Sequence, residues 1–341
     1  MHKQISSVSL YFAIAILLVI SGGVLSDGMK IGLDMCGNVL IPSLFPFMIF
    51  SSYLANSQFV SHSAKLFSKL GEWLKIGGEE IAVFLVSMLS GYPSGSAMLG
   101  TMSRLGKITQ TRASKSVCYC CSAGPAFLVL AVGQGILHNT QSGVILLCSH
   151  IFGSVVTMLV FSRNSDCVSP INSQSNVTKN GIVEAVSSAT ASMICVCSFV
   201  LVFASLGTLP ERLGFGKVAT CVFSCILEVT NGCVRLREIT RFLPIYSAVC
   251  GFGGLSVVAQ CFALCKPISA LKFILARLLN SATSFGFCYF LTLAFPQAVP
   301  TSGAKIEHTT VNPAPLAIAL ILMCVVFSVS VYSEKNKKIV I

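Results

Sequence analysis

Clusters of glycine, proline and hydroxyl residues interrupt long uncharged stretches in which a continuous membrane helix would be expected. Two clusters lie in the first half of the chain, at Ser90-Gly91-Tyr92-Pro93-Ser94-Gly95-Ser96 and Ser122-Ala123-Gly124-Pro125. Two lie in the second half, at Glu228-Val229-Thr230-Asn231-Gly232 and Gly251-Phe252-Gly253-Gly254. Such sequences favour turns, and a turn in lipid frees backbone groups that no water satisfies. These breaks therefore predict segments that are buried in protein or that face a wet cavity.

The half-helices that begin after the breaks direct backbone N–H groups and a partial positive charge toward one central region, which favours an anionic group such as a carboxylate. Any one cluster is equally explained by a kink or a close helix contact, but four breaks in matching pairs favour a binding site. The expected substrate-binding residues are Ser90, Gly91, Tyr92, Pro93, Ser94, Gly95, Ser96, Ser122, Gly124, Pro125, Glu228, Thr230, Asn231, Gly232, Gly251, Gly253, Gly254, Ser256 and Gln260.

Glu228 is the only acid between residues 218 and 234. An ionisable group at membrane depth is by default a functional candidate, here a proton or cation site or an acceptor for substrate. The alternative is an interfacial ion pair with Arg235 or Arg237. Ser256 and Gln260 lie one turn apart, so we expect them to share a helix face, where they donate either to a substrate or to a neighbouring helix.

Other kinds of chemistry find little support in the sequence. Ser94 with His150 as base would suit an intramembrane serine protease, but no glycine stands two residues before this serine. Cys118 and Cys121 form a CxxC spacing without a second pair or a histidine to complete a metal site. There is no P-loop and no HExxH sequence. We expect no enzyme, no metal and no cofactor.

The composition predicts an integral membrane protein. Of the 341 residues, 10% are charged and 54% are hydrophobic, whereas soluble domains carry about a quarter charged residues. The net charge of +11 comes from Lys and Arg in short loops between apolar runs, as in cytoplasmic loops of membrane proteins, so no nucleic acid is expected as a partner. The 16 cysteines lie mostly in apolar runs and are interpreted as reduced packing residues.

Stretches of about 20 apolar residues predict an all-α polytopic protein of about eight transmembrane helices plus two re-entrant hairpins. The first span is expected at residues 8–25, the span that closes the second repeat at about residues 278–298, and the last span at residues 315–332. Residues 35–162 and 182–298 each have the order span, broken hairpin, broken span, span, which gives three crossings per unit. The second unit is therefore inverted relative to the first, an arrangement typical of transporters. The expected parts are an N-terminal helix (1–28), a first repeat (29–162), a polar linker (163–181), a second repeat (182–298) and a C-terminal helix with a basic tail (299–341).

Two groups of basic residues bear on the topology. The acid-free group of Arg104, Lys107, Arg112 and Lys115 indicates a cytoplasmic loop. The eight-crossing layout places the segment from Arg235 to Arg241 near the outer face, against that tendency.

The four clusters also resemble the signatures of the sporulation integral membrane protein YlbJ family, which carries nucleoside-recognition (Gate) repeats. The resemblance runs from about residue 44 to residue 280 and includes Gly251-Phe252-Gly253-Gly254-Leu255-Ser256-Val257 followed by Gln260. It implies a fold similar to concentrative nucleoside transporters. It also implies a role in spore formation, in which dipicolinate moves from the mother cell across the outer forespore membrane. Dipicolinate is a small aromatic dianion, in agreement with the anion-favouring helix ends.

The favoured hypothesis is a multi-pass transporter of a small anionic aromatic solute, in the cell membrane or the outer forespore membrane. The alternatives are a nucleoside or nucleobase transporter, and a non-transporting membrane scaffold for spore envelope assembly. The expected partners are the solute and membrane lipid, and the sequence leaves open whether the chain forms a homo-oligomer.

Overall fold

The computed structural model describes residues 22–57, 65–162, 181–266 and 269–295, and within them the chain is helical without a strand. The expected all-α class is therefore confirmed. Five helical segments are long and apolar enough to cross a membrane: Leu25–Asn56, Thr140–Ser162, Gly181–Arg212, Leu243–Leu264 and Ala270–Ala294. The spans expected at residues 8–25 and 315–332 lie largely or wholly outside the described residues, as does most of the linker 163–181. The total of eight spans stays a prediction.

The first described segment is one long helix with a widened turn. Helix α2 (Gly22–Met35) passes through the expected junction at residues 28 and 29 and leads into the π-helical turn η1 (Cys36–Leu40) and helix α3 (Ile41–Asn56). The N–H of Ile41 donates to the carbonyl of Cys36, five residues back. Pro42 follows, and because proline has no N–H and its ring crowds the preceding turn, the helix widens there.

The first hairpin begins and ends at the same end of the bundle. It follows the short helix α5 (Ser68–Leu74) and consists of α6 (Gly78–Ser90) and α7 (Ser94–Arg104), after which comes α8 (Gln110–Ser116). Arg112 of α8 donates from Nε to Glu80 Oε1 at 2.6 Å, at the start of α6. Ser103, near the end of α7, donates to Gln110 Oε1 at 2.6 Å. The two ends of the hairpin are thus joined through α8.

Lys107 connects these hairpin ends to the end of α3, because its Nζ donates to the carbonyls of Ala55 and Ser57 at 2.7 and 2.8 Å. Helix α10 (Gly181–Gly207) begins at this same end, where a Cβ on Gly181 would lie 3.7 Å from the ring of Tyr53. We call it the Lys107 end of the bundle.

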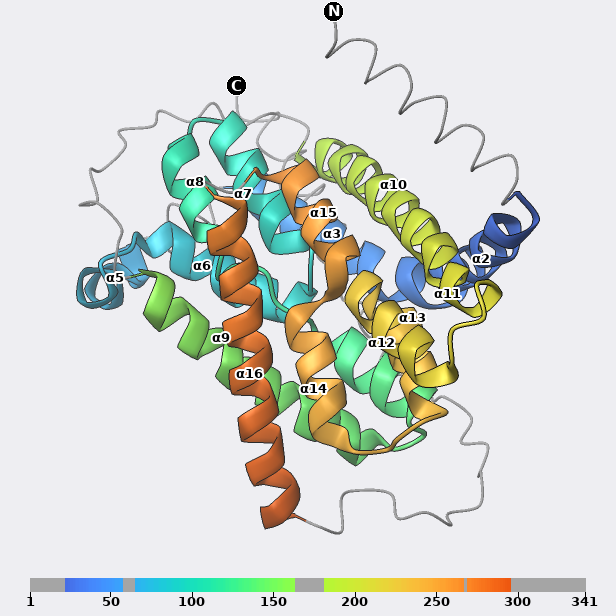
Figure 1. Cartoon of the computed structure of the whole chain (residues 1–341). Helices are drawn as coiled ribbons and strands as arrows, with labels where there is room; N and C mark the ends of the chain where they lie inside the picture. Colours follow the sequence, from blue (N-terminus) through green and yellow to red (C-terminus); the bar gives the residue numbers. More distant parts are fainter. Residues whose placement is uncertain (1–21, 58–64, 163–180, 267–268, 296–341) are drawn as a thin grey trace, which may run out of the picture.

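The second hairpin opens at the opposite end. Helices α12 (Lys217–Leu227) and α13 (Val229–Arg237) follow the short helix α11 (Leu209–Arg212). Arg235 pairs with Glu211 at 3.1 Å, so the end of α13 lies beside the residues that precede α12. Arg212 pairs in turn with Asp27 of α2 at 3.3 Å. This is the Asp27 end of the bundle, and α10 runs to it from the Lys107 end, antiparallel to α3 and beside α2 (Figure 1).

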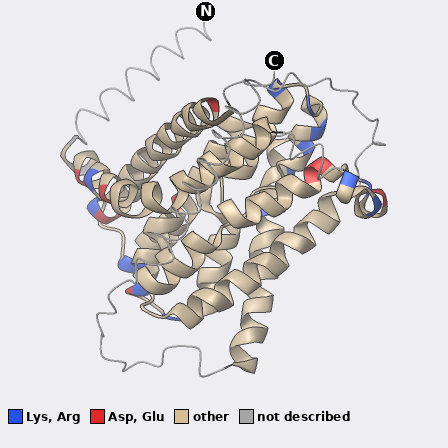
Figure 2. Ribbon diagram, turned by 180° about the vertical axis from the view of Figure 1, so that it is seen from behind, with Lys and Arg blue, Asp and Glu red and all other residues tan. Residues whose placement is uncertain are grey.

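The remaining helices pack around the two hairpins. They are η2 (Ala126–Ile136), a π-helix, together with α9 (Thr140–Ser162), α14 (Leu243–Phe252), α15 (Gly254–Leu264) and α16 (Ala270–Ala294). Helices α9 and α16 cross each other (Figure 1), and the rings of Phe152 and Phe287 stack between them with centroids 4.2 Å apart. Figure 2 shows most of the charged residues gathered toward the two ends, with few charges between them. This distribution is that of a bundle whose middle lies in lipid.

The last described span starts earlier than the sequence indicated. We expected it from about residue 278, after the last charge, but α16 begins at Ala270. Lys272 and Arg277 therefore lie inside the helix, and Arg277 is buried in the bundle.

Candidate functional site

All four predicted breaks interrupt helices in the structure. The first lies between α6 and α7 at residues 91–93, and the second is an extended stretch at residues 121–124. The third separates α12 from α13 at Glu228, and the fourth separates α14 from α15 at Gly253. Gly91 and Gly253 have φ values of 81° and 85°. Since this left-handed region favours glycine, both residues fit the turns that they make.

The breaks pack in two couples, one in each half of the chain. A Cβ on Gly124 would lie 2.8 Å from the backbone nitrogen of Gly91, so the first and second breaks touch backbone to backbone. A Cβ on Gly254 would lie 3.0 Å from the carbonyl oxygen of Leu227 and 3.2 Å from Cα of Glu228, which brings the third and fourth breaks together. No side chain fits between the members of either couple.

The two couples meet at one buried cavity, which we call the central cavity. Six of the predicted site residues line it: Gly91, Tyr92, Gly124, Glu228, Thr230 and Gln260. Seven apolar residues that were not predicted complete the lining: Leu40, Leu44, Phe127, Val196, Val200, Val229 and Val257. Its volume is about 20 Å³, which is room for about one water molecule. The helices around it must separate before a larger solute enters.

Glu228 holds the start of its own helix. Its side chain is buried and accepts hydrogen bonds from the N–H groups of Thr230 at 3.1 Å and Asn231 at 2.7 Å. A carboxylate in this position satisfies two free N–H groups and neutralises the positive end of the helix dipole. The alternative, an interfacial ion pair of Glu228 with Arg235 or Arg237, is wrong, because Glu228 is buried and forms no ion pair among the described residues, and Arg235 pairs with Glu211.

Polar atoms at the cavity have free hydrogen-bonding capacity. Within the described residues, the hydroxyl group of Tyr92 is buried and has no partner. Gln260 donates to the hydroxyl of Ser256 at 3.0 Å, which confirms that these two residues share a helix face. Such unpartnered hydroxyl groups are rare in folded proteins and mark places where a ligand or water completes the hydrogen bonding.

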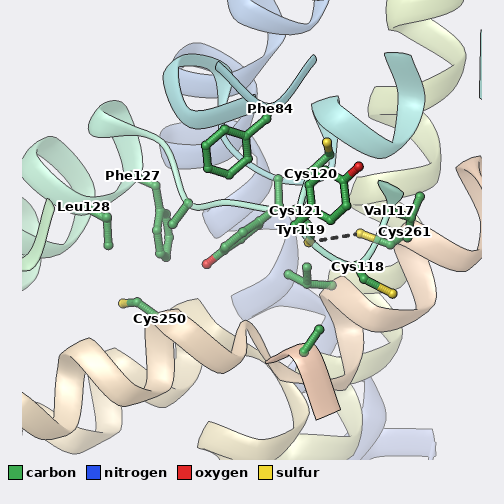
Figure 3. Close-up of a cluster of buried hydrophobic side chains, with 14 of the residues drawn as sticks. Phe84, Val117, Cys118, Tyr119, Cys120, Cys121, Phe127, Leu128, Cys250 and Cys261 are labelled. Carbon is green, nitrogen blue, oxygen red and sulfur yellow. Dashed lines mark hydrogen bonds between the residues drawn. The ribbon is translucent and has the colours of Figure 1, made fainter. Parts of the chain in front are cut away.

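The second break is held by side chains from two other helices. His150 of α9 accepts a hydrogen bond at its Nε2 from the N–H of Ala123 at 2.7 Å. Arg277 of α16, 1% exposed, donates to the carbonyls of Cys121 and Cys118. Figure 3 shows Tyr119, Cys120 and Cys121 leading into this stretch, with Cys261 of α15 opposite Cys121 at an Sγ–Sγ distance of 3.3 Å. The fourteen described cysteines are all free, in agreement with packing residues.

The burial of Arg277 was not predicted, because its charge was interpreted as the edge of a loop. A sequence signal for the earlier start of α16 lies two helical turns before Arg277. The hydroxyl of Ser269 accepts a hydrogen bond from the N–H of Lys272 at 3.4 Å and caps the helix. Serine before an apolar run is an N-cap pattern that predicts a helix start at this position.

Several other predicted residues make packing contacts outside the lining of the central cavity. Ser94 donates to the carbonyl of Gly91, Ser122 bonds to Ser154 of α9 at 2.7 Å, and Gly251 packs against the backbone of Ser281. The remaining predicted residues that do not line the cavity are Ser90, Pro93, Gly95, Ser96, Pro125, Asn231, Gly232, Gly253, Gly254 and Ser256. The hydrogen bonds of Ser94 and His150 go to separate backbone groups, so the described residues show no serine–histidine pair of the kind a protease uses.

The fold and the cavity define an integral, multi-pass membrane protein with discontinuous helices at its centre. The chain is similar to the sporulation integral membrane protein YlbJ of Bacillus subtilis (strain 168). The two are 24% identical over 313 residues, which cover 78% of this chain and 77% of that protein. This match confirms the resemblance carried by the four motifs and supports membership of the YlbJ family. No family model matches the chain, and no solved structure matches it.

Proposed function

We propose that the protein transports a small anionic aromatic solute through the central cavity. Dipicolinate, crossing the cell membrane or the outer forespore membrane during sporulation, is the solute that fits best. The observation that carries this proposal is the meeting of four broken helices at one buried cavity. The similarity to a sporulation integral membrane protein is consistent with a membrane role in sporulation.

The orientation of the two hairpins supports transport over a scaffold role. The first hairpin opens at the Lys107 end and the second at the Asp27 end, while Gly91 and Glu228 near their tips line the same cavity. Re-entrant hairpins of inverted repeats have this arrangement, and transporters with such repeats expose a fixed central site to each side in turn. A scaffold has no need of two oppositely directed hairpins that meet at one cavity.

Glu228 is the group that we assign to coupling. Its carboxylate already accepts from the N–H groups at the start of α13, so a solute carboxylate in the same cavity would lie close to it. Two negative charges in a small, largely apolar cavity repel each other strongly. Anion binding is therefore favoured when Glu228 carries a proton or when a cation accompanies the solute.

The proposal is tested by dipicolinate flux in proteoliposomes. We expect Glu228→Gln to alter the dependence of flux on the pH gradient, and Gly91→Leu to abolish flux because its side chain would enter the contact with Gly124. Glu238→Gln, at an exposed position after α13, is the matched control and should transport normally. Normal transport by both Glu228→Gln and Gly91→Leu would show that the site is elsewhere.

A nucleoside or nucleobase is the second candidate, and the neutral polar groups of the lining are the observation in its favour. The lining combines apolar side chains with the neutral hydrogen-bonding groups of Tyr92, Thr230 and Gln260, which suit a ring and its substituents. Thermal shifts of the purified protein separate the two candidates. A true ligand at 100 times its dissociation constant should stabilise the protein by roughly 2.7 kcal/mol, whereas a scaffold should show no shift with either solute.

A further inference from the structure

A second, smaller cavity lies beside the central cavity, and five of its nine lining residues carry a hydroxyl group. Helices α3, α7 and α10 enclose it. Its volume is about 10 Å³, close to the space that one water molecule needs. The lining residues are Met48, Ser51 and Ser52 of α3, Ala97, Met98 and Thr101 of α7, and Ser188, Ala189 and Ser192 of α10.

The two cavities are stacked along the same elements. On α3, Leu44 lines the central cavity and Met48 lines the second. On α10, Val196 lines the central cavity and Ser192 the second. Four residues make about one helical turn, or about 5.4 Å along the axis. A single layer of side chains therefore separates the cavities.

The second cavity contains an unsatisfied polar group. Ser52 is 8% exposed, and its hydroxyl is buried and has no partner among the described residues. Thr101 lines the same cavity from α7. Its hydroxyl accepts a hydrogen bond at 3.1 Å from Arg104, an exposed residue at the end of α7. A lone hydroxyl of this kind is satisfied by water or by a polar ligand. The cavity thus lies between the central cavity and a cation at the Lys107 end.

We infer that the second cavity is a wet vestibule through which a small carboxylate solute passes between the central cavity and the Lys107 end of the bundle. The hydroxyl groups of α3, α7 and α10 replace water around the carboxylate, and Arg104 attracts it at the mouth. The layer formed by Leu44, Met48 and Val196 is the barrier between vestibule and central cavity. The inference rests on the proposed function for the identity of the solute, but the presence of water in the vestibule does not depend on it.

The first experiment tests for water without any solute. Hydroxyl radicals made in situ oxidise methionines that lie beside water. Met98 lines the vestibule and is 1% exposed, whereas Met102, one turn further along α7, is 0% exposed and does not line it. Met48 is 3% exposed and the control Met158 of α9 is 7% exposed. We expect Met48 and Met98 to be oxidised several-fold faster than Met102 and Met158. Exposed fraction alone would predict the opposite order for Met48 and Met158, because Met158 is the more exposed of the two. Equal or slower oxidation of Met48 and Met98 would overturn the inference.

The second experiment tests for passage of the solute. Ser52→Leu should fill the vestibule and lower dipicolinate flux at least tenfold, while the thermal shift produced by dipicolinate is retained because the central cavity is untouched. Ser52→Ala, which removes the hydroxyl without filling the vestibule, should lower the flux much less than Ser52→Leu. Ser198→Leu, on the exposed face of α10, is the matched control, and Ser192→Leu replaces Ser52→Leu if that variant does not fold. Unchanged flux in the folded leucine variants contradicts the vestibule. If the wild-type protein neither transports nor binds dipicolinate, the proposed function is contradicted instead. The oxidation experiment then still decides whether the vestibule contains water.

Discussion

The guanidinium of Arg277 donates to the backbone oxygen of Cys121 at the start of the second break. A side chain of α16 therefore satisfies a carbonyl that has lost its helical partner. Its second bond, to the carbonyl of Cys118, is 3.4 Å long. No acid pairs with Arg277 in the described residues of the chain. Its charge is therefore balanced by carbonyl dipoles that the break itself sets free.

Arg277→Leu should destabilise the protein because it leaves these buried carbonyls without a donor. The expected loss is about 1–3 kcal/mol of the free energy of unfolding, seen as a lower midpoint of thermal unfolding in detergent. Arg277→Lys should recover some of that loss. Lys272→Leu changes an exposed position on the same helix and should have little effect. Equal midpoints for the two leucine variants would contradict the role of Arg277.

Gly124→Ala should force the first two breaks apart. The added Cβ would lie 2.8 Å from the nitrogen of Gly91, and backbone cannot retreat as a flexible side chain does. We expect a loss of about 1–3 kcal/mol in stability together with reduced flux. Gly286→Ala on α16 is the control, since no atom of the described residues outside its own helix lies within 4 Å of a Cβ there. That control should be neutral or slightly stabilising.

Arg112→Gln should lower the thermal stability of the protein more than most single substitutions at the ends of the bundle. Burial lowers the pKa of Arg112, but the hydrogen bonds and charges of Glu80 and Glu79 outweigh it and raise that pKa. The side chain of Glu80 is 4% exposed, so removing its partner strands a buried charge at a cost of about 3–5 kcal/mol. Adding Glu80→Gln to Arg112→Gln should restore some of the thermal stability. No recovery in the double variant would show that the ion pair is not the cause.

Tyr92→Phe should separate binding from stability. The hydroxyl has no partner among the described residues, so its removal should leave the unfolding midpoint unchanged or slightly higher. If the hydroxyl contacts the solute, the dissociation constant measured by titration should rise about tenfold, which corresponds to about 1.4 kcal/mol. A fall in stability with unchanged affinity would show that Tyr92 serves packing alone.

The helix breaks were predictable because glycine, proline and hydroxyl clusters act locally on the backbone. The residues at 91–93, 121–124, 228 and 253 break helices where the sequence indicated. The apolar lining of the central cavity was not predictable. Leu44 and Val196 lie in long apolar helices, and which side of such a helix faces the cavity depends on the helices that pack against it. The ion pair between Arg235 and Glu211 was missed for the same reason, since it joins elements through the fold.

The glycine contacts within each couple have a mechanical consequence. With no side chain between Gly91 and Gly124, neither break has room to slide past the other, and the contact of Gly254 with residues 227 and 228 constrains the second couple in the same way. In the transport cycle proposed above, we therefore expect each couple to move as one rigid unit. Opening of the cavity would then separate the two couples along the line where α3 packs on α10, and the loaded and empty states would differ in the spacing between them.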